Sequence, residues 1–114
     1  MTQHKKINIP FWHDVIHHSL CQHRNLIQKV YLISESSLQF AIVLKHDTID
    51  NEGEIIDIKI KYDQTKIAHE LPLIFSFPTE KMMDNAEYYK ILDLNKKVFH
   101  PLITDPISFL PYIL

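Results

Sequence analysis

The sequence predicts an α+β domain, because one segment has the periodicity of a helix and several later segments have the two-residue period of β-strands. In residues 10–25 the large apolar side chains recur at helical spacing. Pro10 suits the first turn of such a helix, where its missing N–H is not needed. From residue 27 onward the period changes to two. We therefore expect an N-terminal helix packed on one face of a four-stranded antiparallel meander.

Four runs rich in β-branched and aromatic residues supply the expected strands, at residues 27–34, 38–45, 54–62 and 71–77. In the third run isoleucines alternate with charged residues, which gives this strand one face in water. Short polar links suit hairpins, and Gly53 is free to take a positive φ in one of them. The residues expected in the core are Phe40, Ile42, Ile58, Ile60 and Phe75.

Residues 79–95 have no comparable strand pattern. Met82, Ala86 and Tyr89 are spaced for a short amphipathic helix, but Asp84 and Asn85 would weaken it. We expect this segment to be irregular.

Length and charge restrict the class of protein. A chain of 114 residues with 46% hydrophobic residues fits a single domain, residues 1–114. The formal charge of −2 comes without any basic run, so we expect no nucleic-acid partner. No apolar stretch approaches the about 20 residues of a membrane span, and the N-terminal residues lack the apolar centre of a secretory signal. These features favour a cytoplasmic protein, or a nuclear one.

Two features invite a chemical interpretation, and each has a simpler alternative. His13 and His17 have the i,i+4 spacing that places two imidazoles on one helix face, but no further ligand completes a metal motif, so a solvated histidine face is favoured. Cys21 could act as a nucleophile with His17 one turn away, but an inert thiol is commoner. With one glycine, the chain cannot build a glycine-rich phosphate loop. We expect no cofactor, no metal and no catalytic residue.

The order of elements and two sequence blocks resemble the ubiquitin-conjugating enzyme fold. Residues 38–75 are similar to the family's second to fourth strands, and "VFHPLI" at residues 98–103 resembles its His-Pro signature, carried here by Phe99, His100 and Pro101. In the family a catalytic cysteine follows the histidine by about ten residues, a position that falls at Phe109 or Leu110 here. The asparagine expected after His-Pro is Leu102.

The resemblance therefore implies a catalytically inactive ubiquitin-conjugating enzyme variant, most similar to the AKT-interacting protein (Fused Toes) branch and lacking the C-terminal helices. It further implies an adaptor or scaffold whose partners are proteins, such as ubiquitin or a coiled-coil adaptor of the Hook kind. An RWD-type structural subunit without any ubiquitin role, or a small enzyme of unrecognised kind, are the alternatives. The apolar tail is the candidate partner-binding or homo-oligomer surface, through Ile107, Phe109, Leu110, Tyr112 and Ile113.

Overall fold

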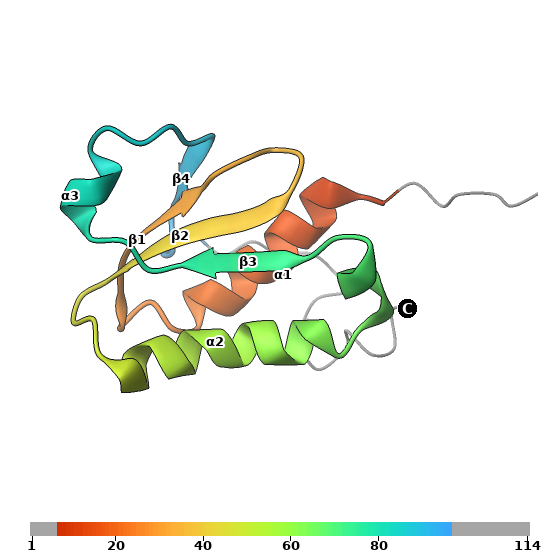
Figure 1. The fold of residues 1–114 in the computed structure, drawn as a ribbon, viewed down its shortest axis with the longest axis horizontal. Coiled ribbons are helices and arrows are strands. Elements are labelled where there is room, and N and C mark those ends of the chain that lie inside the picture. Colours follow the sequence, from red (N-terminus) through yellow and green to blue (C-terminus); the bar gives the residue numbers. More distant parts are fainter. Residues whose placement is uncertain (1–6, 97–114) are drawn as a thin grey trace, which may run out of the picture.

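The computed structural model describes residues 7–96 and has the α+β architecture that the sequence predicts (Figure 1). The elements in chain order are α1 (Ile9–Cys21), β1 (Ile27–Leu32), β2 (Leu38–Leu44), α2 (Ile49–Asp63), the 3₁₀ helix η1 (Lys66–His69), β3 (Leu73–Ser76), α3 (Glu80–Met83) and β4 (Lys90–Leu92). The strands form one four-stranded sheet in the order β3-β2-β1-β4. Within residues 7–96, no helix combines the length and apolar character that crossing a bilayer requires.

Helix α1 begins at the predicted place. The side-chain oxygen of Asn8 accepts a hydrogen bond from the Phe11 N–H at 3.1 Å, and Pro10 lies in the first turn. The helix ends at Cys21, four residues before the predicted end, because a series of turns leads directly into β1. In these turns the Leu26 N–H donates to the His23 carbonyl oxygen at 2.9 Å.

Strands β1 and β2 form the predicted antiparallel hairpin. Val30 pairs with Ile42 and Leu32 with Phe40, so the apolar residues of both strands share one face. In the connecting turn the Ser36 N–H donates to the Ser34 hydroxyl at 3.1 Å. The predictions for residues 27–34 and 38–45 are confirmed.

The predicted strand at residues 54–62 is wrong, because this segment lies inside α2. Thr48 caps the helix by accepting a hydrogen bond from the Asn51 N–H at 3.1 Å. The buried residues Ile55, Ile58 and Tyr62 recur at helical spacing, whereas Ile60 is 53% exposed and not in the core. Gly53 lies in the helix without a positive φ, so its predicted turn role is also wrong.

This helix changes the sheet. It carries the chain across the sheet, so β3 returns parallel to β2, with Leu38 opposite Leu73 and Phe40 opposite Phe75. The predicted strand at residues 71–77 is confirmed as β3, but the sheet is mixed and the wholly antiparallel meander is wrong. The fourth strand is β4, which lies in the segment predicted to be irregular and pairs antiparallel with β1.

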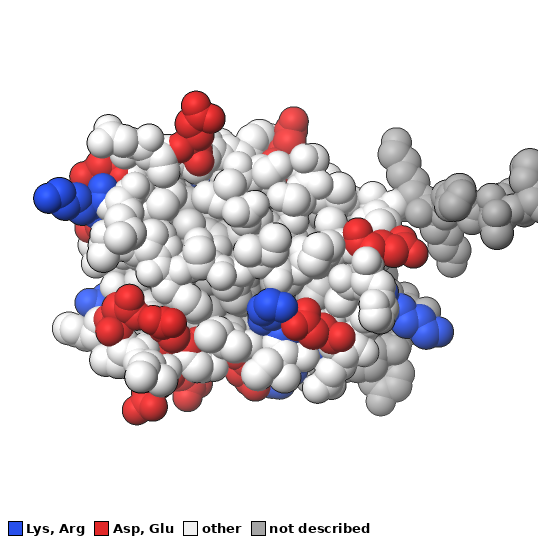
Figure 2. Space-filling model, viewed as in Figure 1, with Lys and Arg blue, Asp and Glu red and all other residues white. Residues whose placement is uncertain are grey.

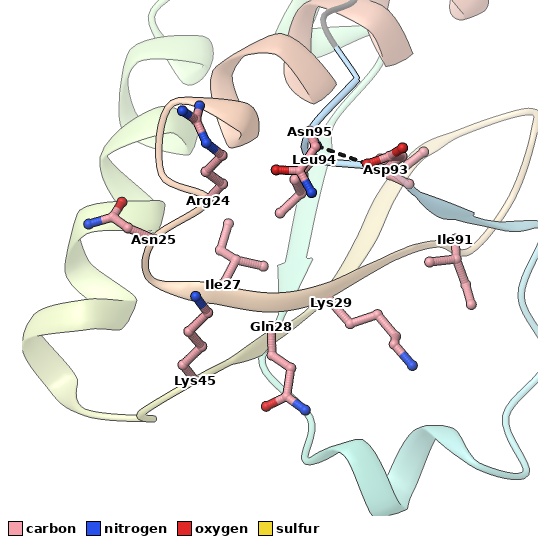
Figure 3. Close-up of a pocket in the computed structure, with 11 residues that line it drawn as sticks. Arg24, Asn25, Ile27, Gln28, Lys29, Lys45, Ile91, Asp93, Leu94 and Asn95 are labelled. Atoms are coloured by element: carbon pink, nitrogen blue, oxygen red, sulfur yellow. Dashed lines mark hydrogen bonds between the residues drawn. The ribbon is translucent and has the colours of Figure 1, made fainter.

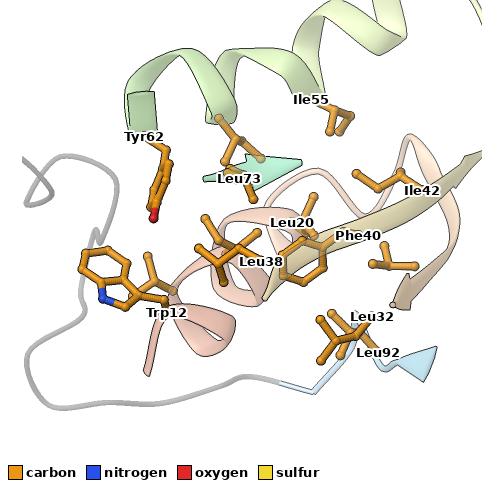
Figure 4. Packing of buried hydrophobic residues seen from close by; sticks show 14 of the residues in the cluster. Trp12, Leu20, Leu32, Leu38, Phe40, Ile42, Ile55, Tyr62, Leu73 and Leu92 are labelled. Carbon is orange, nitrogen blue, oxygen red and sulfur yellow. The ribbon is translucent and has the colours of Figure 1, made fainter. Parts of the chain in front are cut away.

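The sheet separates two apolar clusters. On one face α1 and α2 pack against the inward residues of the strands, and the view in Figure 4 shows Tyr62, Leu73, Leu38 and Phe40 meeting there. Phe40 and Ile42 are fully buried as predicted, Ile58 is buried in α2, and Phe75 is half-buried. On the other face a smaller cluster joins Tyr31, Ala41 and Val43 to Met83 of α3. The α3 side covers this second face only in part, since Ile74 is 45% exposed and Ile91 47% exposed.

Candidate protein-interaction surface

A groove of about 530 Å³ lies between the start of β1 and the chain that follows β4 (Figure 3). Its lining residues come from the α1–β1 turns, β1, the end of β2 and residues 91–95: Arg24, Asn25, Ile27, Gln28, Lys29, Lys45, Ile91, Leu92, Asp93, Leu94 and Asn95. The groove therefore joins an apolar floor to a polar rim.

The groove exists because β4 is shorter than β1. Strand β1 begins at Ile27, but its register with β4 covers only Val30–Leu32. After Leu92 the chain turns, since the Asn95 N–H donates to an Asp93 carboxylate oxygen at 2.9 Å and the Lys96 N–H to the Asp93 carbonyl oxygen at 3.2 Å. The first part of β1 is thus left beside an open space.

Helix α1 holds the chain at residues 93–96, of which residues 93–95 line the groove. Because a carbonyl oxygen only accepts, the Nε2–H of neutral His17 donates to the Asp93 carbonyl oxygen, at 2.8 Å. The Cys21 thiol lies 3.7 Å from the Lys96 carbonyl oxygen. Burial lowers the pKa of His17, which favours the neutral imidazole.

The cations of the groove differ in their partners. Lys29 lies 3.5 Å from a carboxylate oxygen of Glu80, whose other oxygen accepts from the Gln28 side chain at 2.7 Å. The pKa of Lys29 is raised, first by Tyr31 and then by Glu80. The Arg24 guanidinium donates to the backbone carbonyl oxygen of Cys21 at 3.2 Å. Within the described part of the chain, neither Arg24 nor Lys45 forms an ion pair.

An exposed apolar patch adjoins the groove. We call Tyr88, Tyr89 and Ile91 the β4 patch; they are 43%, 53% and 47% exposed. Ile91 pairs with Tyr31 across the strands, and the Tyr31 ring contacts that of Tyr88 at a centroid distance of 4.9 Å. Ile91 also lines the groove. Patch and groove therefore form one continuous surface at the β4 edge of the sheet.

Acidic side chains gather elsewhere, over the beginning of α2 at the lower left of Figure 2. Asp50 and Glu52 lie in the first turn, where the helix dipole favours negative charge. The pKa of Glu52 is raised by a hydrogen bond with Asp47. These carboxylates thus have a structural role at the helix N-terminus.

The histidines singled out in the sequence point to different backbone groups. His13 Nε2–H donates to the Ser37 carbonyl oxygen at 2.7 Å, and His17 to Asp93. No three potential metal ligands cluster within residues 7–96. Burial raises the pKa of the Cys21 thiol, which opposes thiolate formation.

The tail predictions concern residues that lie outside the described range. These are the family motif at Phe99, His100 and Pro101, the cysteine position at Phe109 and Leu110, and the binding candidates Ile107, Phe109, Leu110, Tyr112 and Ile113. They stay predictions.

Sequence reasoning missed the groove and the β4 patch. Arg24 and Lys45 stand 21 positions apart, and both line the groove because the hairpin folds back, where the Lys45 N–H donates to the Leu26 carbonyl oxygen at 3.0 Å. Adjacent tyrosines at 88 and 89, in a polar segment, were the available signal for a surface site.

Comparison of the chain with protein-family models, with curated proteins and with solved structures gave no match.

Proposed function

We propose that this chain is a non-catalytic protein-interaction domain, an adaptor or scaffold that binds a partner protein through the β4 edge of its sheet. The observation that carries the proposal is the β4 patch beside the groove. Tyrosine and isoleucine side chains exposed side by side are costly to leave in water and are enriched where proteins associate. Ile91 belongs to the β4 patch and also lines the groove, which supports this edge as the docking surface.

The proposal includes the cytoplasm or nucleus as its location, as the sequence predicts. The resemblance to inactive ubiquitin-conjugating enzyme variants stays a prediction. We do not rest the function on it, because residues 54–62 lie in a helix and the His-Pro motif lies outside the described residues. An RWD-type structural subunit is the alternative, and it would use the same surface in a permanent assembly.

The test compares a patch variant with a matched control. Tagged full-length chain, Tyr89→Ser/Ile91→Ser and Ile49→Ser are expressed at equal levels, and co-purifying proteins are quantified by mass spectrometry. Ile49 is a suitable control because it is 90% exposed and lies at the start of α2.

We expect a set of proteins that the wild type and Ile49→Ser retain and the patch variant loses. If the patch variant and the control retain the same proteins, or if none exceeds the tag alone, the β4 edge is not a docking surface.

A further inference from the structure

We propose that the groove binds an extended, acidic peptide segment of the partner protein, with the peptide backbone along the first residues of β1 and its carboxylates at Arg24 and Lys45. This inference rests on the proposed function and specifies the chemistry of the partner.

The backbone of β1 offers the first part of the site. Among the described residues, β4 pairs only with Val30–Leu32, so no strand lies beside the beginning of β1 on the β4 side. A bulge between Ile27 and Lys29 also leaves Gln28 outside the register with β2. Unpaired strand backbone is a template for an added strand. The groove is therefore suited to an extended segment.

The side chains set the charge that the segment must carry. Glu80 already pairs with Lys29, and Arg24 and Lys45 have no acidic partner among the described residues. Asp93 is the acidic residue of the lining, and its carboxylate accepts the hydrogen bond of its own turn. Arginine and lysine side chains that lack an acidic partner favour carboxylates at the rim of an interface.

The apolar floor of the groove indicates that apolar residues should alternate with the acidic residues of the bound segment. Ile27 and Leu92 are buried, while Ile91 is 47% exposed and continues into the β4 patch. Because successive side chains of a strand point to opposite faces, a segment with apolar and acidic residues in alternation can contact the floor and the cations together. Neutral or basic segments would leave both cations unpaired.

A nucleic-acid backbone fits this surface less well. Two cations without an acidic partner in residues 7–96 are too few to follow a run of phosphates, and acidic residues dominate the first turn of α2.

The probe is a phage-displayed library of random linear peptides, selected on immobilised full-length chain and counter-selected on the Arg24→Glu/Lys45→Glu variant. Both residues are exposed, so charge reversal leaves the fold intact, which circular dichroism checks. Enriched peptides are synthesised, and their binding is measured by fluorescence anisotropy. Lys66→Glu is the matched control, because Lys66 is an exposed lysine on η1, outside the groove lining.

We expect enriched peptides in which Asp or Glu alternates with apolar residues, and binding that shifts the Gln28 and Lys29 amide resonances. Each of Arg24→Glu and Lys45→Glu should weaken peptide binding about tenfold or more. Replacing the Asp and Glu residues of the peptide by Asn and Gln should have the same effect. Lys66→Glu should leave the affinity unchanged.

The inference is overturned if neutral or basic peptides are enriched or if no peptide is enriched. It is also overturned if acidic peptides bind the wild type, Arg24→Glu and Lys45→Glu equally well. Displacement of the peptide by a single-stranded oligonucleotide would assign the groove to phosphates and overturn it as well. The two proposals can fail separately. If co-purifying proteins are lost in Tyr89→Ser/Ile91→Ser but retained in Arg24→Glu/Lys45→Glu, the proposed interaction domain stands and the proposed acidic segment is wrong.

Discussion

The hydroxyl of Tyr62, near the end of α2, donates a hydrogen bond to the backbone carbonyl oxygen of Leu71, two residues before β3 begins. Tyr62 is fully buried, and its ring contacts Trp12 of α1 at a centroid distance of 5.8 Å. One side chain therefore fixes α2 against both α1 and the chain that enters the parallel strand. Burial raises the pKa of Tyr62, so the hydroxyl stays protonated and can donate.

Tyr62→Phe should keep the ring packing and leave the Leu71 carbonyl oxygen without this donor. We expect the free energy of unfolding to fall by about 1–3 kcal/mol, because a buried acceptor loses its partner. Urea unfolding followed by circular dichroism measures the change. Tyr89→Phe is the control, since Tyr89 is 53% exposed, and an equal loss in both variants would contradict the role of the Leu71 bond.

The two isoleucines of α2 should respond differently to a charge. Ile58 is 3% exposed and Ile60 is 53% exposed. Ile58→Asp buries an unpaired carboxylate and should cost several kcal/mol, enough to unfold a small domain, whereas Ile60→Asp should cost less than about 1 kcal/mol. Thermal melts of both variants provide the measurement. Similar melting of the two would mean that they share one face, as in a strand.

Gly53→Ala should stabilise the protein. Gly53 lies in α2 with no positive φ, and a Cβ at this position would meet nothing within 4 Å. Alanine favours the helix over glycine by about 0.5–1 kcal/mol. Chemical denaturation should therefore show a higher midpoint, and a lower one would indicate a turn conformation that needs glycine.

The sequence carried enough information for α1, the hairpin and β3, because each has one dominant period and a clear boundary. Residues 54–62 were ambiguous: isoleucines at 56, 58 and 60 alternate, but Ile55, Ile58 and Tyr62 also match a helix. The Thr48 cap and the i,i+4 pairs Lys59–Asp63, at 2.6 Å, and Lys61–Asp57, at 3.1 Å, belong to the helix. Weighing these local signals would have favoured α2.

Other features depend on contacts between distant segments. Strand β4 has three residues, too few for a period, and it forms because Ile91 meets Tyr31 of β1. The groove likewise depends on the hairpin, which places Arg24 and Lys45 along the same lining. The pattern of a single sequence does not show which distant segments pair, so the candidate site could not be predicted. The adjacent tyrosines at 88 and 89 were its one sequence signal.

His17 should make stability depend on pH. Its pKa is lowered in the folded state because burial outweighs the hydrogen bond with Asp93, while the unfolded value is near 6.5. The unfolded chain therefore binds the proton first as pH falls, so the stabilising contribution is complete above about pH 6.5 and is lost as pH falls toward the folded pKa.

Urea midpoints measured across this range should thus fall more steeply in the wild type than in His17→Asn. Equal slopes in the two proteins would show that His17 does not titrate differently on folding.

Cys21 should be a poor nucleophile in the folded protein. Burial raises its thiol pKa against the opposing effect of Arg24, and the thiol contacts the Lys96 carbonyl oxygen. A thiol-specific reagent at neutral pH should react more slowly with the native chain than with the chain in denaturant.

Because the Cys21 thiol is a poor nucleophile, incubation with ubiquitin and a ubiquitin-activating enzyme should give no reducible adduct of ubiquitin on the protein. A ubiquitin-conjugating enzyme serves as the positive control. An adduct that forms on the wild type and is absent in Cys21→Ser would contradict the proposal of a non-catalytic domain, because it would show that the protein can make this thiol reactive despite its burial.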